Sequence, residues 1–226
     1  MGINETIPIN EKDLGFRIYK LSNNSPLKLA GVKEISDFII PPQEIYQKKI
    51  PFYTWIKEKE GQNINLKIYS LLTRSIKEIN INLNKKENNE GLLGGSFNYE
   101  NYKEAYCKLL HVTKVKKNSF AMVSLNLIDM QDYLIAVKNI NESKYFTINN
   151  SLKKPIESFI SILKENKGKQ CEFFIYNIKR GPKIVLATIP NDKNFSFGCD
   201  VAYGKVHEFP MKKEDSDDEE KKILKG

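Results

Sequence analysis

The sequence predicts an α+β chain of two similar halves, and three observations support this. Short runs that alternate apolar and polar residues predict strands, and only a few segments have helical spacing. The turn Asn24-Ser25-Pro26-Leu27 returns as Asn118-Ser119-Phe120-Ala121. The run Asp37-Phe38-Ile39-Ile40 returns as Asp132-Tyr133-Leu134-Ile135. A repeat of this kind indicates one structural unit used twice.

The first half opens with three short elements. Residues 16–21 place apolar side chains among polar ones, which predicts a strand. The polar turn that follows ends at Pro26, which suits the first turn of a helix because its missing N–H would have no partner there. Residues 37–40 predict a second strand, and Pro41 and Pro42 are expected to end it.

A helix and a hairpin follow. Residues 51–61 begin with proline, end with glycine and place Phe52 and Ile56 on one helical face. Residues 63–72 and 75–83 alternate apolar and polar side chains, which predicts a hairpin.

The second half repeats this plan less regularly. Residues 109–115 predict a strand, and the spacing of apolar residues from Pro155 predicts a helix that ends near Gly168. Residues 174–177 and 184–189 are expected to pair across a turn that contains glycine and proline.

These patterns together resemble the Golgi reassembly and stacking protein (GRASP) family. Its first domain carries G-F/Y-H-x-x-x-V-x-x-N-S-P-x-x-x-A-G-L-x-x-x-x-D-F-I-I. The matching residues are Gly15, Phe16, Asn24, Ser25, Pro26, Ala30, Gly31, Asp37, Phe38, Ile39 and Ile40. The family's G-L-L-G stands at residues 91–94. Its second domain ends L-G-C-G-I-G-Y-G-x-x-H-x-x-P, matched by Gly198, Cys199, Tyr203, Gly204, His207 and Pro210.

The resemblance covers about residues 15–210. It implies two tandem, circularly permuted PDZ-like domains, each a small β-barrel or sandwich with two helices. The expected limits are a leader over 1–14, a first domain over 15–104, a second over 105–210 and a charged tail over 211–226.

The resemblance also implies a groove for a peptide C-terminus or for a second copy. In such a loop, glycine lets successive backbone N–H groups point at one carboxylate, and the next strand pairs with the peptide. The expected groove residues are Leu92, Leu93, Gly94, Gly95, Ser96, Phe97, Phe52 and Ile56. From the residues alone, a glycine-rich hairpin turn is the alternative.

The second loop departs from the family pattern. Its expected residues are Phe197, Gly198 and Cys199, but Asp200 replaces a glycine and would repel a bound carboxylate. Whether this second groove takes a ligand stays open.

A family metal site has no plausible equivalent here. Some members have a proposed site of two histidines on the first strand and a later cysteine. The matching positions here are Arg17, Tyr19 and Glu100, which together are not plausible zinc ligands. We therefore expect no metal and no cofactor.

Composition limits the other functions. The 226 residues include 40% apolar residues, enough for ordinary cores, and no run long enough to span a bilayer. No secretory signal opens the chain, so we expect its three cysteines to be reduced. Net charge is +8, and residues 211–226 contribute 5 − 6 = −1, which leaves +9 on residues 1–210. This charge favours anionic partners or lipid surfaces, although solvated lysines explain it equally well.

Two modification sites are expected outside the domains. Met1-Gly2-Ile3-Asn4-Glu5-Thr6 fits the N-myristoylation pattern, and GRASP proteins typically carry the lipid at this glycine. A disordered leader is the alternative and is compatible with a lipid. Ser216 precedes four acidic residues, a context that acidophilic kinases prefer.

The leading hypothesis is a non-enzymatic tether on the cytoplasmic face of Golgi membranes. It would associate with further copies of itself in trans and bind the C-terminus of a golgin-like coiled-coil protein. The alternative is a PDZ-type adaptor for cargo C-termini in secretion, including unconventional secretion, without stacking. No RNP, zinc-knuckle or helix-turn-helix pattern suggests nucleic-acid binding. No G-x-S-x-G, P-loop or H-E-x-x-H pattern occurs, and His111 and His207 are far apart in matching strand regions.

Overall fold

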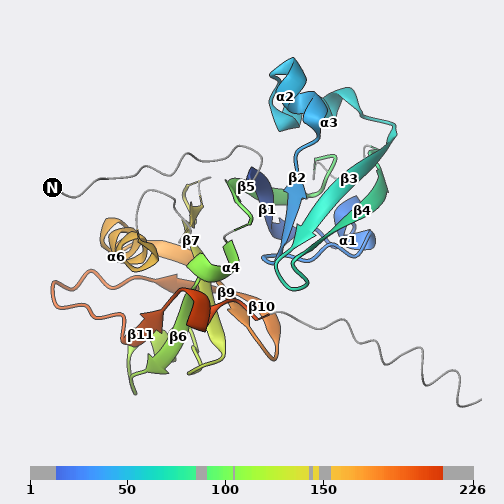
Figure 1. The fold of residues 1–226 in the computed structure, drawn as a ribbon. Coiled ribbons are helices and arrows are strands. Elements are labelled where there is room, and N and C mark those ends of the chain that lie inside the picture. Colours follow the sequence, from blue (N-terminus) through green and yellow to red (C-terminus); the bar gives the residue numbers. More distant parts are fainter. Residues whose placement is uncertain (1–13, 85–90, 104, 143–144, 148–153, 211–226) are drawn as a thin grey trace, which may run out of the picture.

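A computed structural model describes residues 14–84, 91–103, 105–142, 145–147 and 154–210. Gly2 and Ser216 lie outside the described residues, as do the predicted tail and nearly all of the leader. The described chain forms two separate antiparallel sheets, one from each half, with short helices around them (Figure 1). The predicted α+β class is confirmed.

The first sheet has the order β4-β3-β2-β1-β5, so its last strand lies beside its first. Its register pairs Phe16 with Ile39 on one side and with Tyr99 on the other. In chain order its elements are β1 (Leu14–Leu21), α1 (Pro26–Leu29), β2 (Asp37–Ile40), α2 (Gln43–Lys48), α3 (Phe52–Glu58), β3 (Asn63–Ser70), β4 (Ser75–Asn82) and β5 (Gly95–Asn101).

The second sheet repeats this topology. Its order is β10-β9-β7-β6-β11, and β8 pairs with β7 in addition. As in the first sheet, the last strand, β11, lies beside the first, β6. The elements are α4 (Ala105–Lys108), β6 (Leu110–Val115), α5 (Phe120–Val123), β7 (Asp132–Asn139), β8 (Phe146–Thr147), α6 (Pro155–Glu165), β9 (Gln170–Asn177), β10 (Gly181–Thr188), β11 (Cys199–Ala202) and the 3₁₀ turn η2 (Lys205–His207).

Within the described residues, each half has one helix more than the two expected: α2 is the additional helix in the first half, and the second half has α4, α5 and α6. Pro41 and Pro42 do end β2, but Pro42 is also the N-cap of α2. Glu44 in the first turn of α2 pairs with Lys48 one turn later, and Lys49 ends the helix with φ of 53°. Proline before a helix is compatible with its start, so the same residues stop one element and begin the next.

The repeat extends to individual hydrogen bonds. Ser25 caps α1 by accepting the N–H of Lys28 at 2.9 Å, and Ser119 caps α5 by accepting that of Met122 at 3.3 Å. A capping hydroxyl satisfies one of the unpaired donors of the first helical turn. Because serine supplies the cap, the second copy keeps its short helix although Phe120 replaces the proline.

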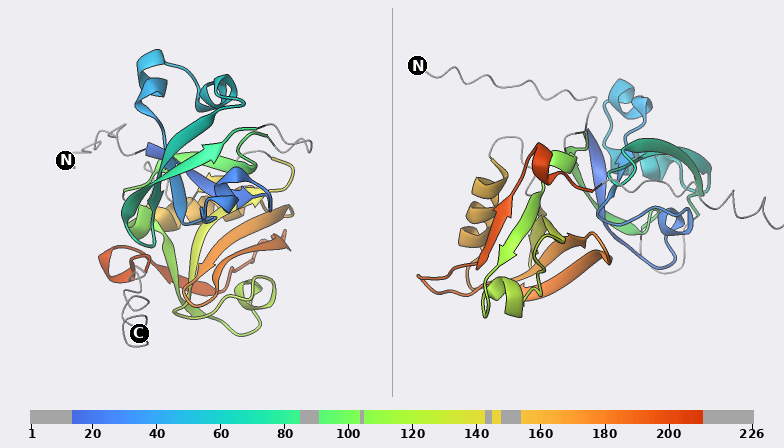
Figure 2. Two further views of the ribbon diagram at one scale, coloured as in Figure 1. Left: turned by 90° about the vertical axis from the view of Figure 1, so that its right-hand side faces the viewer. Right: turned by 60° about the horizontal axis from the view of Figure 1, so that its bottom comes forward.

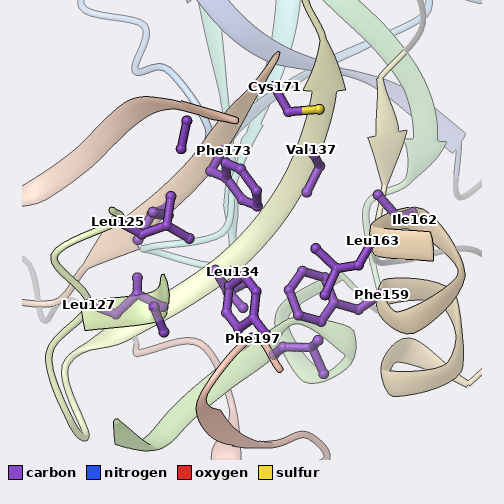
Figure 3. Close-up of a cluster of buried hydrophobic side chains, with 14 of the residues drawn as sticks. Leu125, Leu127, Leu134, Val137, Phe159, Ile162, Leu163, Cys171, Phe173 and Phe197 are labelled. Carbon is purple, nitrogen blue, oxygen red and sulfur yellow. The ribbon is translucent and has the colours of Figure 1, made fainter. Parts of the chain in front are cut away.

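The central strand of each sheet, β2 or β7, is buried on both faces, which explains why it reads as a nearly continuous apolar run. In β7, Leu134 points into the core of the second domain, where Phe159 and Leu163 of α6 pack against Phe173 (Figure 3). Tyr133 and Ile135, one residue to either side, belong to a different cluster. This alternation follows from the two-residue period of a strand.

That different cluster, here called the shared cluster, joins the two domains. It lies between the two sheets, on the faces that they turn toward each other. Helix α6 covers the second sheet on its other face, away from the first domain (Figure 2). Tyr19 of β1 stacks on Tyr145 with ring centroids 4.1 Å apart, and Phe209 is fully buried. The members are Tyr19, Ile35, Phe38, Tyr69, Leu71, Leu72, Tyr102, Ala105, Leu109, Tyr133, Ile135, Ala136, Tyr145, Phe174, Tyr176 and Phe209.

Arg17, Tyr19 and Glu100 meet beside the shared cluster. The Arg17 Nε donates to Glu100 Oε2 at 2.9 Å, and the Tyr19 hydroxyl donates to Glu100 Oε1 at 2.6 Å. Arg17 also donates to the carbonyl of Ile35 at 2.7 Å and covers the ring of Phe38. Burial, together with the Glu100 carboxylate, raises the pKa of Tyr19 well above its usual value. The guanidinium cation thus neutralises the carboxylate in a buried, hydrogen-bonded triad.

We expect Arg17→Met to destabilise the first domain by about 3–5 kcal/mol, because it leaves the buried Glu100 carboxylate without its cation. Urea unfolding followed by the fluorescence of Trp55, the only tryptophan, measures this. Lys67→Met is the matched control, because the Lys67–Glu78 pair is exposed and should contribute less than about 1 kcal/mol. Equal losses in the two variants would contradict the assigned role of the triad.

Candidate functional site

A groove of about 1510 Å³ opens on the first domain between α1, α3, β5 and the glycine loop. The glycine loop is residues 91–94, which lead directly into β5. A volume of this size suits a short peptide rather than a single small metabolite. The groove is the candidate functional site.

The glycine loop is held against the turn that begins α1. Gly94 has φ of +60°, and a Cβ at this position would lie 2.7 Å from the Cβ of Ser25 and 2.8 Å from the hydroxyl of Ser22. The Ser22 N–H donates to the carbonyl of Gly94 at 2.9 Å. Only glycine combines this backbone conformation with so close an approach. The N-S-P turn and the G-L-L-G loop therefore depend on each other.

The glycine loop lines the groove and contains backbone donors that differ in their use. The Gly94 N–H is used within the loop, donating to the carbonyl of Gly91 at 3.1 Å. The N–H groups of Leu92 and Leu93 donate to no backbone or side-chain acceptor in the described part of the chain. Two successive donors of this kind are the arrangement that binds a carboxylate.

The strand after the loop can accept a further strand. Among the described strands, β5 pairs with β1 alone, so its other edge is open. Gly95, Phe97 and Tyr99 of β5 all line the groove. An extended peptide could therefore add to β5 while its side chains fill the groove.

Aromatic rings form one wall. Phe16 of β1 stacks on Phe52 of α3 with centroids 4.5 Å apart and lies 4.8 Å from the ring of Tyr99. The Trp55 N–H fixes α3 to α2 by donating to Glu44 at 2.7 Å. Hydrogen bonds from Lys48, and then from Trp55, lower the pKa of Glu44 to about 2. These contacts position the helix that carries the wall.

Seven of the eight residues expected for the first groove line it: Leu92, Leu93, Gly94, Gly95, Phe97, Phe52 and Ile56. Ser96 does not line it and is a correction. Strand alternation turns Ser96 to the opposite face of β5 from its two neighbours, where its hydroxyl accepts a hydrogen bond from Tyr145 at 2.8 Å. Ser96 therefore contacts the second domain.

Burial separates the five lining residues other than the two glycines into two groups. Leu93 is only 6% exposed and belongs to the core of the first domain with Phe52 and Ile56. Leu92 and Phe97 are half-buried. A charge at Leu93 would therefore disturb the fold as well as the groove.

The groove has further lining residues that the sequence did not indicate, among them Phe16, Leu29, Tyr53 and Tyr99. Leu29 and Tyr53 are 72% and 74% exposed, which is unusual for such large apolar surfaces. Their position on the outer faces of two short helices is visible only once the helices are placed.

The loop of the second domain is built differently. Phe197 stands where Leu93 stands and lies 4.9 Å from Phe159, ring to ring, in the core. Phe120, which replaces the groove-lining Pro26, contacts the rings of Phe173 and Phe197. Side chains thus fill the space beside this second loop, and Phe197 belongs to the core of the second domain.

The surroundings of Gly198 and Cys199 indicate that both residues contribute to packing rather than to a binding site. Gly198 repeats the close approach of Gly94, because a Cβ there would lie 2.1 Å from that of Ser119. Cys199 is partly buried, and burial, with a smaller effect from Asp200, raises its pKa to about 12. The thiol therefore stays protonated and unreactive at neutral pH.

The two histidines that the sequence places far apart are in contact. The Nδ1 atoms of His111 on β6 and His207 in η2 lie 3.2 Å apart. The expectation that both lie in strands was wrong for His207, which follows the last strand.

Comparison with known proteins agrees with this geometry. The GRASP55/65 PDZ-like domain matches twice, over residues 5–99 and 67–212. The chain belongs to this family. Golgi reassembly-stacking protein 1 of Homo sapiens is 23% identical over 201 residues, which is 87% of this chain and 43% of that protein. The mouse protein of that name is 22% identical over 201 residues, 87% of this chain and 42% of its own length.

An uncharacterized protein of Schizosaccharomyces pombe is 22% identical over 205 residues, covering 89% of this chain and 55% of that protein. The chain spans less than half the length of the two mammalian relatives. Family membership confirms the fold of two PDZ-like domains, and members are non-enzymatic scaffolds of a Golgi-associated family. No helix among the described residues is long and apolar enough to cross a bilayer.

Gly94→Ala and Gly91→Ala test the contact between loop and turn as a matched pair. Both glycines have positive φ, of +60° and +69°, but nothing lies within 4 Å of a Cβ at Gly91. Gly91→Ala should cost about 1–2 kcal/mol from backbone strain alone. Gly94→Ala should cost about 1–3 kcal/mol more, because it also overpacks Ser25. Trp55 fluorescence during urea unfolding measures both, and equal costs would show that the contact does not constrain the loop.

Proposed function

We propose that the chain is a membrane tether of the Golgi whose first groove takes the C-terminal segment of a partner. The partner is either a golgin-like coiled-coil protein or a second copy of the chain on the facing membrane. The proposal rests on one combination in an apolar groove: the N–H groups of Leu92 and Leu93 donate to no acceptor among the described residues, and β5 pairs with only one of the described strands.

The lining supports an apolar peptide end. Leu29, Phe97 and Tyr53 offer side-chain surface to the groove, and its charged lining residues are Lys57 and Glu60. Main-chain pairing to β5 would supply affinity, and apolar side-chain contacts would supply selectivity. The filled second loop leaves the first domain as the one that carries peptide binding in this proposal.

Membrane attachment would need two signals. One myristoyl chain, proposed at Gly2, gives only marginal binding, with an association constant of order 10⁴ per molar. Lys12 is the only basic residue among the first fourteen, so the leader adds little attraction. The +9 charge on residues 1–210 would supply a weak, salt-sensitive attraction to anionic lipid. A partner already on the membrane would raise the effective concentration much more.

A groove variant separates peptide binding from folding. Leu29→Asp places a charge on an exposed groove residue, and Val123→Asp places the same charge at the matching position of α5, also 72% exposed. In a vesicle-clustering assay with lipid-anchored protein, Leu29→Asp should weaken clustering at least about tenfold, because an unpaired carboxylate buried in an apolar contact costs more than 1.4 kcal/mol.

Val123→Asp should leave clustering unchanged. Clustering by Leu29→Asp as strong as by wild type would remove the groove from tethering. If Leu29→Asp lost only the capture of cargo C-termini, with clustering intact, an adaptor in secretion would be the better description.

The lipid proposal has its own test. Gly2→Ala abolishes acylation, because the transferase requires an N-terminal glycine, and should release most of the protein from Golgi membranes to the cytosol. Fractionation of cells that express each form measures this. Equal membrane association of Gly2→Ala and wild type would mean that the attachment does not depend on a lipid at Gly2.

A further inference from the structure

Residues 204–210, here called the strap, cross from the second domain to the first. The strap begins at Gly204, whose N–H donates to the carbonyl of Cys107 at 2.9 Å, and continues through η2. In Figure 2 this red end of the chain lies beside α4, close to the first domain. The strap therefore spans the boundary between the domains.

The far end of the strap closes the shared cluster. Phe209 is fully buried, with its ring 5.3 Å from Tyr133 and 4.6 Å from Tyr176. Its N–H donates to the carbonyl of Tyr106 at 2.7 Å. Arg74, in the turn between β3 and β4, donates to Glu208 Oε2 at 2.7 Å. One short segment thus fills part of the shared cluster and pairs with the first domain.

The near end of the strap rests on a contact between two imidazole rings. His207 Nδ1 lies 3.2 Å from His111 Nδ1, and His111 is 7% exposed and stacked on Tyr133 at 4.5 Å. At this separation one Nδ1 must carry a proton and the other must accept it. Protonation of both would point two N–H groups, and two positive charges, at each other.

We propose that the His111–His207 contact is a proton-sensitive latch, which holds the strap against both domains at neutral pH and releases it in mild acid. Release would withdraw Phe209 from the shared cluster and break the Arg74–Glu208 pair. The two domains would then be free to change their relative orientation. The proposal concerns the second domain and does not depend on what the first groove binds.

The other charged and titratable groups around the latch do not neutralise the positive charge that a second protonated imidazole would bring. Tyr133 packs against His111 from β7, and Cys107 and Tyr106 meet the strap from α4. On the strap itself, Lys205 is cationic and Glu208 is already paired with Arg74. Within the described residues, no carboxylate forms an ion pair with either imidazole. Burial, then the neighbouring His207, lowers the pKa of His111, and a backbone interaction with Met130 offsets this in part.

The direction of the pH effect follows from proton counting. Each neutral imidazole already carries one ring proton. The closed strap can bind one additional proton without placing two Nδ1–H groups opposite each other, whereas in the open strap each histidine can bind an additional proton. The closed form therefore binds fewer protons, so its stability rises with pH and is lost as pH falls below about 6.5. If opening takes up one proton, the equilibrium constant for opening of the strap rises tenfold for each unit by which pH falls in that range.

Hydrogen exchange of the full chain, in buffer with a chelator, tests the latch at pH 7.5 and pH 5.5. After correction for intrinsic rates, protection of the Gly204, His207 and Phe209 amides should fall roughly tenfold in acid. The Ile189 amide, bonded to the Lys169 carbonyl elsewhere in the second domain, should not change. Unchanged strap protection in wild type would overturn the proposal.

Two variants identify the group that titrates. His207→Asn keeps a polar atom near the Nδ1 position but does not titrate, so the loss of protection in acid should disappear. His111→Asn provides the same test from β6 if the first variant folds poorly. Glu208→Gln removes the carboxylate that pairs with Arg74 and should keep the acid effect. An acid effect that persists in both asparagine variants, or that vanishes in Glu208→Gln, would assign it to other groups and overturn the latch.

Discussion

Each domain depends on the close approach between a glycine and the serine that caps its short helix. Gly94 meets Ser25 in the first domain, and Gly198 meets Ser119 in the second. A backbone hydrogen bond of 2.9 Å accompanies each contact: the Ser22 N–H donates to the Gly94 carbonyl, and the Lys116 N–H donates to the Gly198 carbonyl. This contact joins the start of each domain to its end, so the last strand lies beside the first. In the first domain it also fixes the loop that lines the groove.

The second constraint is that the central strand of each sheet is buried on both faces. Helices cover one face, and the shared cluster covers the other, so the domains cannot separate without exposing Tyr19, Phe174 and Phe209. In the folded first domain, the Arg17 guanidinium compensates the negative charge of the buried Glu100 carboxylate. The groove lies away from the shared cluster, on the helix side of its sheet.

Much of the architecture could be predicted, because it depends on local sequence patterns that each indicate one kind of element. Asparagine, serine and proline before an apolar run predict a capped helix, and alternation predicted the hairpin of β3 and β4. What failed depended on distant contacts. Ser96 faces the second domain, where its hydroxyl accepts a hydrogen bond from Tyr145. Phe197 lies in the core of the second domain, against Phe120, which replaces a proline of the first copy. The contact of His111 with His207 joins residues 96 positions apart, and no local pattern indicates it.

In the proposed complex, the Leu92 and Leu93 N–H groups receive the terminal carboxylate of a peptide that pairs with β5. Amide chemical shifts of the full chain, recorded with a short valine-ended peptide and with its C-terminal amide, test this binding mode. We expect the free carboxylate to move the Leu92 and Leu93 amide signals and those of β5, and the amidated peptide to bind at least about tenfold more weakly. Equal binding of the two peptides, or shifts confined to the second domain, would contradict it.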